Sequence, residues 1–450
     1  MSGRRVVITG SGWITPMGHD LDSVWKRLVA GDTMVGPIDR FDAATFPTSF
    51  ANQVRDYDWT KYVESAARHG QPGMHTAFAL GAARQAWNAS GLGDMDGLDR
   101  RRCGLYLGSG EGALDFDSYQ KSTTASWQKD LAKINEGSWH AAATEYIDGA
   151  YEVAQEPNEP ITHIAREFGL RGPAFNCLTA CAASTQAIGE ACDILRRGDA
   201  DVMISGGTHT MLHVLGITGF NRLTALSTRS EDPEHASRPF SRSRGGFVMG
   251  EGSGVIVLES LEHAEARGAT ILAEVTGYGS SADAYRITDL HPDGRGPAAA
   301  MHAAMREAGI DPKRCDAQGR PEVQYISAHG TGTQENDAIE TKSVKLVFGD
   351  NAPKIPMTSI KSMMGHLICA AGAVELITCL LIMREGIIPP TINLTDPDPD
   401  LDLDYVPNVA RTATVDTCLS NSFPHITCTV MVNLNSKTEG LIFFNKHCIT

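Results

Sequence analysis

Short apolar runs that end in glycine alternate with longer stretches of helical spacing along most of the chain. Runs at 6–9, 103–107 and 200–205 lead directly into glycine, and the run at 323–328 leads into His329-Gly330, as is typical of buried strands that end in a tight turn. Apolar residues at helical spacing occur at 22–30, 76–90, 182–197 and 366–384. This alternation predicts an α/β protein with largely parallel sheets.

The same order of elements occurs twice along the chain. We therefore predict two similar α/β halves, at residues 1–259 and 260–436, followed by an atypical tail at 437–450. The segment 115–160 is polar and has no regular period, which predicts a long loop or cap inserted in the first half. The corresponding pairs are Val6–Gly12 with Val275–Gly279, Cys103–Gly112 with Tyr325–Gly332, and the helix after Cys181 with the helix at His366–Arg384.

A strand that turns abruptly into a helix is predicted at 171–197. Small and apolar residues at 174–179 follow the turn Gly172-Pro173, and helical spacing begins at Ala182. Cys181 therefore lies at the corner. Unpaired N–H groups and partial positive charge at a helix N-terminus favour the thiolate, which is the reactive form of cysteine. On this stretch alone, a small core cysteine is an equally simple interpretation.

Composition narrows the possible classes of protein. The 450 residues include 45 glycines and carry a net charge of −15, which argues against general nucleic-acid binding. Ten cysteines are scattered without a paired motif, which indicates reduced thiols in a cytoplasmic protein. No signal or transit peptide is recognised ahead of the first strand. The apolar run 367–383 contains Glu375 and glycine–alanine breaks, which favours a buried helix over a membrane span.

Two histidines stand beside glycines at points where predicted strands and helices meet. His329 follows the strand at 323–328, and His366 ends the stretch Ser359–His366, which also contains Lys361. Because ligands bind beyond the carboxyl ends of strands in open α/β sheets, Cys181, His329 and His366 are expected in one cleft with Lys361 nearby. A zinc site from these residues is the weaker hypothesis, since no fourth soft ligand stands at the usual spacing.

Three motifs in this order resemble those of the β-ketoacyl-[acyl carrier protein] synthases, and most of all the type II elongating synthases of fatty acid synthesis. The resemblance extends from about Arg4 to Phe423. It implies a thiolase-like fold, in which two α/β halves form five layers (αβαβα), and a homodimer. The motifs are Thr179-Ala-Cys-Ala-Ala-Ser184, His329-Gly-Thr-Gly-Thr333 and Ile360-Lys-Ser-Met-Met-Gly-His366.

The resemblance also implies a reaction. Cys181 would accept an acyl chain from an acyl carrier protein, malonyl-carrier would lose carbon dioxide, and a 3-oxoacyl product would form. His329 and His366 would stabilise the enolate, while Lys361, with Glu340 as its partner, would tune the site. The only prosthetic group implied is the phosphopantetheine of the carrier. Further expected site residues are Thr331, Thr333, Thr288, Phe423 and His425 for the substrate, and Arg222, Arg229 and Arg242 for the acidic carrier.

The sequence departs from this family at two places. Segment 115–160 does not follow the usual pattern, so the acyl chain length is not indicated. After Phe423 the family continues Gly-Phe-Gly-Gly, but here Pro424 and His425 follow, and His425 stands where a backbone N–H completes the oxyanion hole. Two alternatives are a non-catalytic partner of the chain-length-factor kind and a coenzyme A-dependent thiolase. The retained Cys181 argues against the first, and the motif at 361–366 argues against the second.

Overall fold

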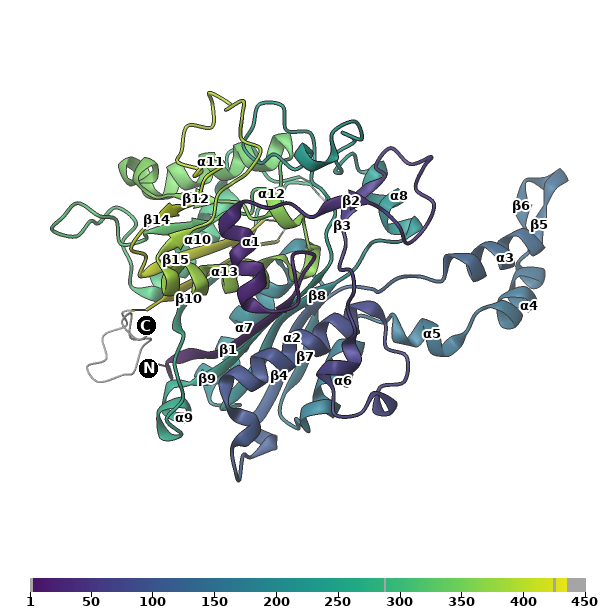
Figure 1. The fold of residues 1–450 in the computed structure, drawn as a ribbon, viewed down its shortest axis with the longest axis horizontal. Helices are drawn as coiled ribbons and strands as arrows, with labels where there is room; N and C mark the ends of the chain where they lie inside the picture. The colour runs from purple at the N-terminus through teal and green to yellow at the C-terminus, as the bar shows by residue number, and fades with distance from the viewer. Residues whose placement is uncertain (1–2, 287–288, 424–425, 435–450) are drawn as a thin grey trace.

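One mixed sheet of ten strands runs through the computed structural model, which describes residues 3–286, 289–423 and 426–434 (Figure 1). Its central strands are buried along their whole length, as their apolar runs predict. Across the sheet the strands are β12 (Met357–Thr358), β11 (Tyr325–Ser327), β15 (Thr417–Ser422), β16 (Ile426–Asn433), β10 (Ala273–Ala282), β1 (Val6–Ile14), β9 (Gly252–Ser260), β8 (Val202–His209), β4 (Cys103–Ser109) and β7 (Ala174–Cys177).

The relative directions of neighbouring strands follow the same order from either edge of the sheet toward its middle. At one edge β7 pairs parallel to β4 and β4 parallel to β8, and at the other edge β12, β11 and β15 are parallel in the same way. The strands nearer the middle are antiparallel, and β1 joins β10 through Val7–Glu274 and Ile8–Ala273. Two similar halves are thus confirmed. The expectation of largely parallel sheets was wrong, because the strands near the middle of the sheet run antiparallel.

Helices form the other three of five layers, which confirms the predicted arrangement. The two halves of the ten-stranded sheet, one of β1, β4 and β7–β9 and the other of β10–β12, β15 and β16, form two of the layers. Helices α7 (Ala183–Arg197) and α13 (Ala371–Glu385) lie between these two halves and contact strands of both. A Cβ at Gly372 would lie only 1.9 Å from Thr185 Oγ1, so glycine is what allows these two helices to approach. The outer layers are α2 (Met74–Ser90) with α6 (Glu159–Phe168) on one side, and α10 (Arg295–Ala308) with α11 (Gln334–Phe348) on the other.

The segment 115–160 forms helices that extend away from the body of the molecule as an arm (Figure 1). The arm contains α3 (Phe116–Ser126), α4 (Glu136–Tyr146), α5 (Gly149–Ala154) and a hairpin of β5 (Trp127–Gln128) and β6 (Lys133–Ile134). Of the long loop or cap that we expected here, the structure has a helical insertion and not a loop. Side chains of Asp115, Asn135 and Asp148 cap the three helices. The helices bury little against the body, so they lack the apolar period that reveals most helices.

The remaining elements lie outside the ten-stranded sheet. Among the described residues, no helix has both the length and the apolar character needed to cross a membrane. The remaining helices and strands are α1 (Leu21–Ala30), α8 (Val214–Arg222), α9 (Leu261–Ala266), α12 (Lys361–Met364), β2 (Val35–Pro37), β3 (Phe50–Asn52), β13 (Ile387–Ile388) and β14 (Arg411–Thr412).

Candidate active site

Cys181 lies in a single 3-10 turn, Ala180–Ala182, between β7 and α7. The preceding residue, Ala180, has a φ of 47°, a left-handed conformation that is uncommon for alanine. The chain therefore turns sharply as it leaves the strand, and helix α7 starts two residues after the sulfur. The predicted strand-to-helix corner is confirmed. Cys181 is also the cysteine of the motif Thr179–Ser184, on which the family resemblance rests.

His366 faces Cys181 directly. Its Nε2 lies 2.9 Å from Cys181 Sγ, and its Nδ1 accepts a hydrogen bond of 3.2 Å from the backbone N–H of Ile368. In the neutral ring the proton is therefore on Nε2, which donates to the sulfur. Burial, followed by the positive charge of Lys361, holds the pKa of His366 well below its usual range. The imidazole is thus an uncharged hydrogen-bond donor aimed at the nucleophile.

His329 completes a group of three. Its ring centroid lies 5.5 Å from that of His366, at an interplanar angle of 83°. The donor atoms of Cys181, His329 and His366 all lie within 4.8 Å of one another, so the predicted convergence is what the structure contains. Burial, Lys361 and His366 lower the pKa of His329 well below its usual range. These three atoms could also hold a soft metal ion with an open fourth position.

Lys361 begins α12 and connects the two histidine loops. Its Nζ donates to the backbone carbonyl of His329 at 2.7 Å and forms an ion pair with Glu375 of α13. All three residues are buried. Burial raises the pKa of Glu375 to about 7, against the opposing effect of Lys361.

Glu340 is not the partner of Lys361, contrary to the sequence expectation. Its carboxylate accepts hydrogen bonds from the backbone N–H groups of His329 at 2.9 Å and Gly330 at 2.8 Å. From α11 the side chain reaches the backbone of the loop, whereas Glu375 reaches the ammonium group of Lys361 from the central layer. Glu375 was visible in the sequence as the one carboxylate in an apolar run. A buried carboxylate needs a partner, and this was the signal that could have identified it.

The thiol of Cys181 titrates in the direction opposite to the sequence expectation. Burial raises its pKa to about 12, although the charge of Lys361 and the backbone N–H of Cys181 itself act to lower it. The effect of the helix N-terminus on the thiol is therefore smaller than the cost of burying a thiolate. Burial therefore favours the protonated thiol over the thiolate in the folded protein.

The expected substrate-binding residues lie partly within the described chain. Thr331 and Thr333 are hydrogen-bonded to each other at 3.0 Å, and Thr333 caps α11 by accepting from the N–H of Asn336 at 3.4 Å. The ring of Phe423 lies 6.1 Å from that of His329. Thr288 and His425 lie outside the described residues.

The arginines proposed for carrier docking divide into two groups. Arg222 and Arg242 are exposed, and neither forms an ion pair within the described part of the chain. Arg229 is half-buried and lies 3.8 Å from Asp232. By contrast, the neighbouring Arg244 is buried and pairs with Asp398 at 2.8 Å, so this one supports the fold.

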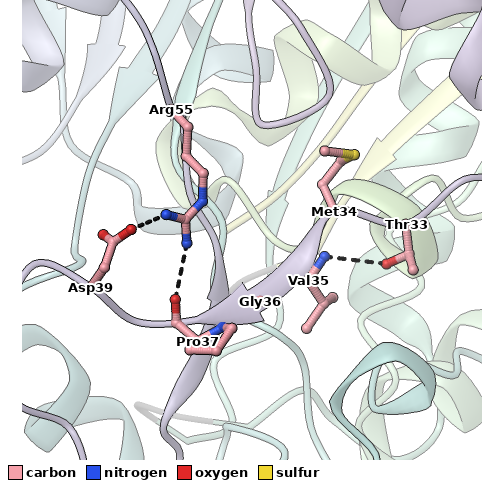
Figure 2. A pocket seen from close by; sticks show the side chains of 7 residues that line it. All are labelled: Thr33, Met34, Val35, Gly36, Pro37, Asp39 and Arg55. Carbon is pink, nitrogen blue, oxygen red and sulfur yellow. Dashed lines mark hydrogen bonds and ion pairs between the residues drawn. The ribbon is translucent and has the colours of Figure 1, made fainter.

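A surface cavity of about 490 Å³ lies beside the β2–β3 hairpin (Figure 2). Arg55 pairs there with Asp39 and donates to the carbonyl of Pro37 at 3.0 Å. The cavity is lined by residues 33–37, Asp39 and Arg55. None of the predicted site residues lines it, so this cavity is separate from the cysteine–histidine group.

Comparison with known proteins agrees with this geometry. The model of the β-ketoacyl synthase N-terminal domain matches residues 3–264, and that of the C-terminal domain matches residues 272–395. The chain belongs to the β-ketoacyl synthase family. Among curated relatives, the 3-oxoacyl-[acyl-carrier-protein] synthase 2 of Coxiella burnetii is 40% identical over 94% of this chain and 96% of its own. The enzyme of the same name from Vibrio harveyi is 39% identical over the same shares.

Solved structures confirm the thiolase-like ketosynthase fold. A β-ketoacyl synthase from Burkholderia phymatum superposes with a TM-score of 0.82 at 29% identity, over 96% of this chain and 99% of its own. A chain from the complex of a type II PKS acyl-carrier protein with its ketosynthase bound to the hexaketide has a TM-score of 0.80 at 32% identity, over the same shares.

Proposed function

We propose that this protein is a condensing acyltransferase that joins an acyl chain to a malonyl-derived unit and forms 3-oxoacyl-[acyl carrier protein]. The observation that carries the proposal is the position of Cys181 Sγ, 2.9 Å from His366 Nε2, with His329 in the same group. The two curated relatives described above are both named 3-oxoacyl-[acyl-carrier-protein] synthase 2. Fatty acid synthesis is the pathway that these names support.

The first step is acyl transfer to Cys181. The sulfur attacks the thioester carbonyl of the acyl carrier, the carrier's sulfur leaves, and the proton of Cys181 passes to the leaving thiolate. Because the Nε2–H of His366 points at the sulfur, it stabilises negative charge there without taking up the proton itself. The lowered pKa of His366 disfavours a second proton on Nδ1, so the ring acts in this step as an uncharged hydrogen-bond donor.

The second step is decarboxylation and condensation. The bond between the malonyl methylene and its carboxylate breaks, carbon dioxide leaves, and the electron pair forms an enolate on the thioester. His329 and His366 donate hydrogen bonds to the enolate oxygen, where charge develops in the transition state. The carbanion then attacks the acyl carbonyl on Cys181, and the cysteine sulfur leaves. Lys361 positions His329, because its Nζ donates a hydrogen bond to the backbone carbonyl of His329.

The partner and the substrate arm follow from this reaction. The reacting groups arrive on the phosphopantetheine of an acyl carrier protein, with Thr331, Thr333, Thr288, Phe423 and His425 as the proposed contacts, and no resident cofactor takes part. The exposed Arg222 and Arg242, with Arg229 between them, are the proposed contacts for an acidic carrier. A cytoplasmic location fits the nine described cysteines, all of which are free thiols.

We also propose a homodimer that forms along the edge strand β7. One side of β7 pairs with β4, and the strand lies at the end of the sheet, so its other side is open. Phe175 and Leu178 are each 49% exposed at this edge, beside the corner that carries Cys181. An apolar edge strand invites pairing with another strand, and a second copy of β7 satisfies both the backbone and the side chains.

One experiment separates this proposal from its alternatives. The protein is incubated with labelled acyl-carrier and malonyl-carrier, and the acyl-enzyme and the 3-oxoacyl product are followed by mass spectrometry. We expect acylation of Cys181 and product formation, both lost in Cys181→Ala and retained in Cys315→Ala. Absence of acylation would favour a chain-length-factor-like partner. Acylation by acyl-coenzyme A, with no reaction from the carrier, would favour a thiolase.

A further inference from the structure

Three buried polar side chains surround the glycine turn at the end of β4. We call His75, His209 and Gln155 the His75–His209 site; their exposed fractions are 0%, 3% and 5%. Both ring nitrogens of His209, Nδ1 of His75 and Oε1 of Gln155 have no hydrogen-bond partner among the residues that the structure describes. Buried polar atoms are nearly always hydrogen-bonded in folded proteins, so these four unpartnered atoms indicate a place where a ligand supplies the partners.

The His209 ring lies on the same side of the sheet as Cys181. Side chains alternate along β8, and a Cβ at Gly207 would lie 2.4 Å from the carbonyl oxygen of Cys369 and 2.7 Å from Ser184 Cβ, in the central layer. His209, two residues further along, projects from the same face. Burial and the nearby His209 both contribute to the lowered pKa of His366, which agrees with this placement.

The glycine turn brings the site against the segment that leads to the nucleophile. A Cβ at Gly110 would lie 2.4 Å from His209 Cε1 and 3.1 Å from Leu178 Cδ1, and Leu178 stands three residues before Cys181. A Cβ at Gly112 would lie 2.2 Å from Gln155 Oε1 and 2.6 Å from His75 Nδ1. Glycine at both positions therefore leaves the polar atoms uncovered by side chains of the turn.

The chemistry of the site selects uncharged oxygen groups. Burial lowers the pKa of His75 to about 4 and that of His209 to about 3, so both rings are neutral at physiological pH. His75 Nε2 donates to the carbonyl of Glu156 at 3.3 Å, so the free Nδ1 of this neutral ring is an acceptor, as is Gln155 Oε1. The neutral ring of His209 offers one donor and one acceptor. Glu111, exposed on the same turn, adds a negative charge that disfavours an anion. A hydroxyl group, which both donates and accepts, fits this set, whereas an oxo group can pair only with the His209 donor and a carboxylate offers no donor at all.

We propose that the His75–His209 site receives a hydroxyl group carried by the acyl chain on Cys181, so that the preferred substrate is a hydroxylated acyl chain. This inference rests on the proposed function, since it requires an acyl chain on Cys181. A saturated chain of the same length leaves the four polar atoms unpaired, and this difference is the source of the selectivity.

The test compares matched acyl carriers. Carrier protein is loaded with octanoyl groups that are saturated or bear one hydroxyl or oxo group at successive carbons, and kcat/KM for acylation of Cys181 is measured for each. We expect at least one hydroxylated chain to be preferred about tenfold over the saturated chain. His209→Leu should reduce this ratio about tenfold, while His209→Gln, which keeps a donor and an acceptor, should restore much of it. His302→Leu, on the exposed face of α10, is the matched control.

The outcomes distinguish this inference from the proposed function. Equal kcat/KM for saturated and hydroxylated chains in the unaltered protein would overturn the inference, even if the variants fail to fold. An equal loss for all chains in His209→Leu would overturn it as well, since this result indicates a purely structural role. Failure of every chain to acylate Cys181 would instead overturn the proposed function and the inference with it.

Discussion

The ammonium group of Lys361 lies 2.7 Å from the backbone carbonyl oxygen of His329 and forms a buried ion pair with Glu375. Through this one side chain, the loop that carries His329 is attached to helix α13 of the central layer. Lys361 is also the first residue of the short helix α12, which leads to His366. The relative position of the two imidazoles therefore depends on Lys361 and on the carboxylate that neutralises it.

We expect Lys361 and Glu375 to be strongly coupled in stability. Removal of one partner leaves a buried charge uncompensated, so Lys361→Met and Glu375→Leu should each lower the free energy of unfolding by about 3–5 kcal/mol. The double variant should lose much less than the sum, yet remain poor in condensation because the His329 loop is no longer held. Chemical denaturation provides the double-mutant cycle, and Lys361→Met with Arg101→Ala, on the exposed surface, is the control pair. Additive losses for Lys361 and Glu375 would contradict the assignment.

Alkylation of Cys181 should increase continuously with pH. Because burial raises the pKa of this thiol to about 12, the thiolate fraction rises about tenfold for each pH unit from 7 to 10. Lys361→Met should slow the reaction at every pH, since it removes a charge that lowers the pKa. Iodoacetamide labelling of the Cys181 peptide measures the rate. A plateau below pH 8 would mean that the thiol is already ionised in the folded protein.

Glu340 should make the protein less stable as the pH rises. Burial raises its pKa from 4.5 to about 7, so the folded state holds a proton that the unfolded chain has already lost between these values. Stability therefore falls as the pH increases from about 4.5 to 7 and stays at the lower level above. The contribution amounts to up to about 3 kcal/mol at 1.36 kcal/mol per pKa unit. The difference between the unaltered protein and Glu340→Gln in urea titrations isolates it; identical pH profiles would refute this assignment.

Carrier affinity should depend on the exposed arginines. Arg222→Glu and Arg242→Glu should each raise KM for the acyl carrier about five- to tenfold at low ionic strength, with a smaller effect on kcat, because charges at the rim mainly affect encounter. Added salt should raise KM of the unaltered protein in the same direction. Arg101→Glu is the control, since Arg101 is exposed but paired with Asp99. Equal effects of all three substitutions would exclude a docking role for Arg222 and Arg242.

Dimer formation should depend on β7. Phe175→Glu places a charge on the exposed apolar edge and should convert the dimer to a monomer, as measured by size-exclusion chromatography with light scattering. Leu346→Glu, which changes another exposed apolar residue (55% exposed, on α11), should leave the dimer intact. A monomeric unaltered protein, or a Phe175→Glu variant that remains dimeric, would disprove pairing along this strand.

Local signals were sufficient to predict the elements that carry the site. The corner at Cys181 follows from a turn, a short apolar run and helical spacing within a few residues, and the resemblance of three motifs pointed to His329 and His366. The internal repeat predicted two similar halves, which the order of strands confirms. Each of these elements can be recognised from residues that are close together in the sequence, and the repeat is a comparison of such local patterns.

Features that depend on distant contacts were not predictable in the same way. The partner of Lys361 is decided by which helix passes over it, so Glu340 on α11 and Glu375 on α13 could not be distinguished by spacing. The pKa of Cys181 depends on burial in the folded protein, whose effect exceeds the local effect of the helix N-terminus. The arm helices extend from the body and have polar sequences, so the sequence shows no apolar spacing from which these helices could be predicted.

The pseudo-twofold arrangement puts Cys181 and Cys369 in equivalent places, each in the middle of the 3-10 turn that precedes the central helix of its half, α7 or α13. His366 lies three residues before Cys369, where the first half has Leu178 instead. Two identical polypeptides related in this way would bring like side chains together, thiol against thiol or imidazole against imidazole. Because both halves belong to one continuous chain, each position is free to carry a different residue. A nucleophile can thus meet its own hydrogen-bond donor across a symmetric framework, and neither half contains a working centre by itself.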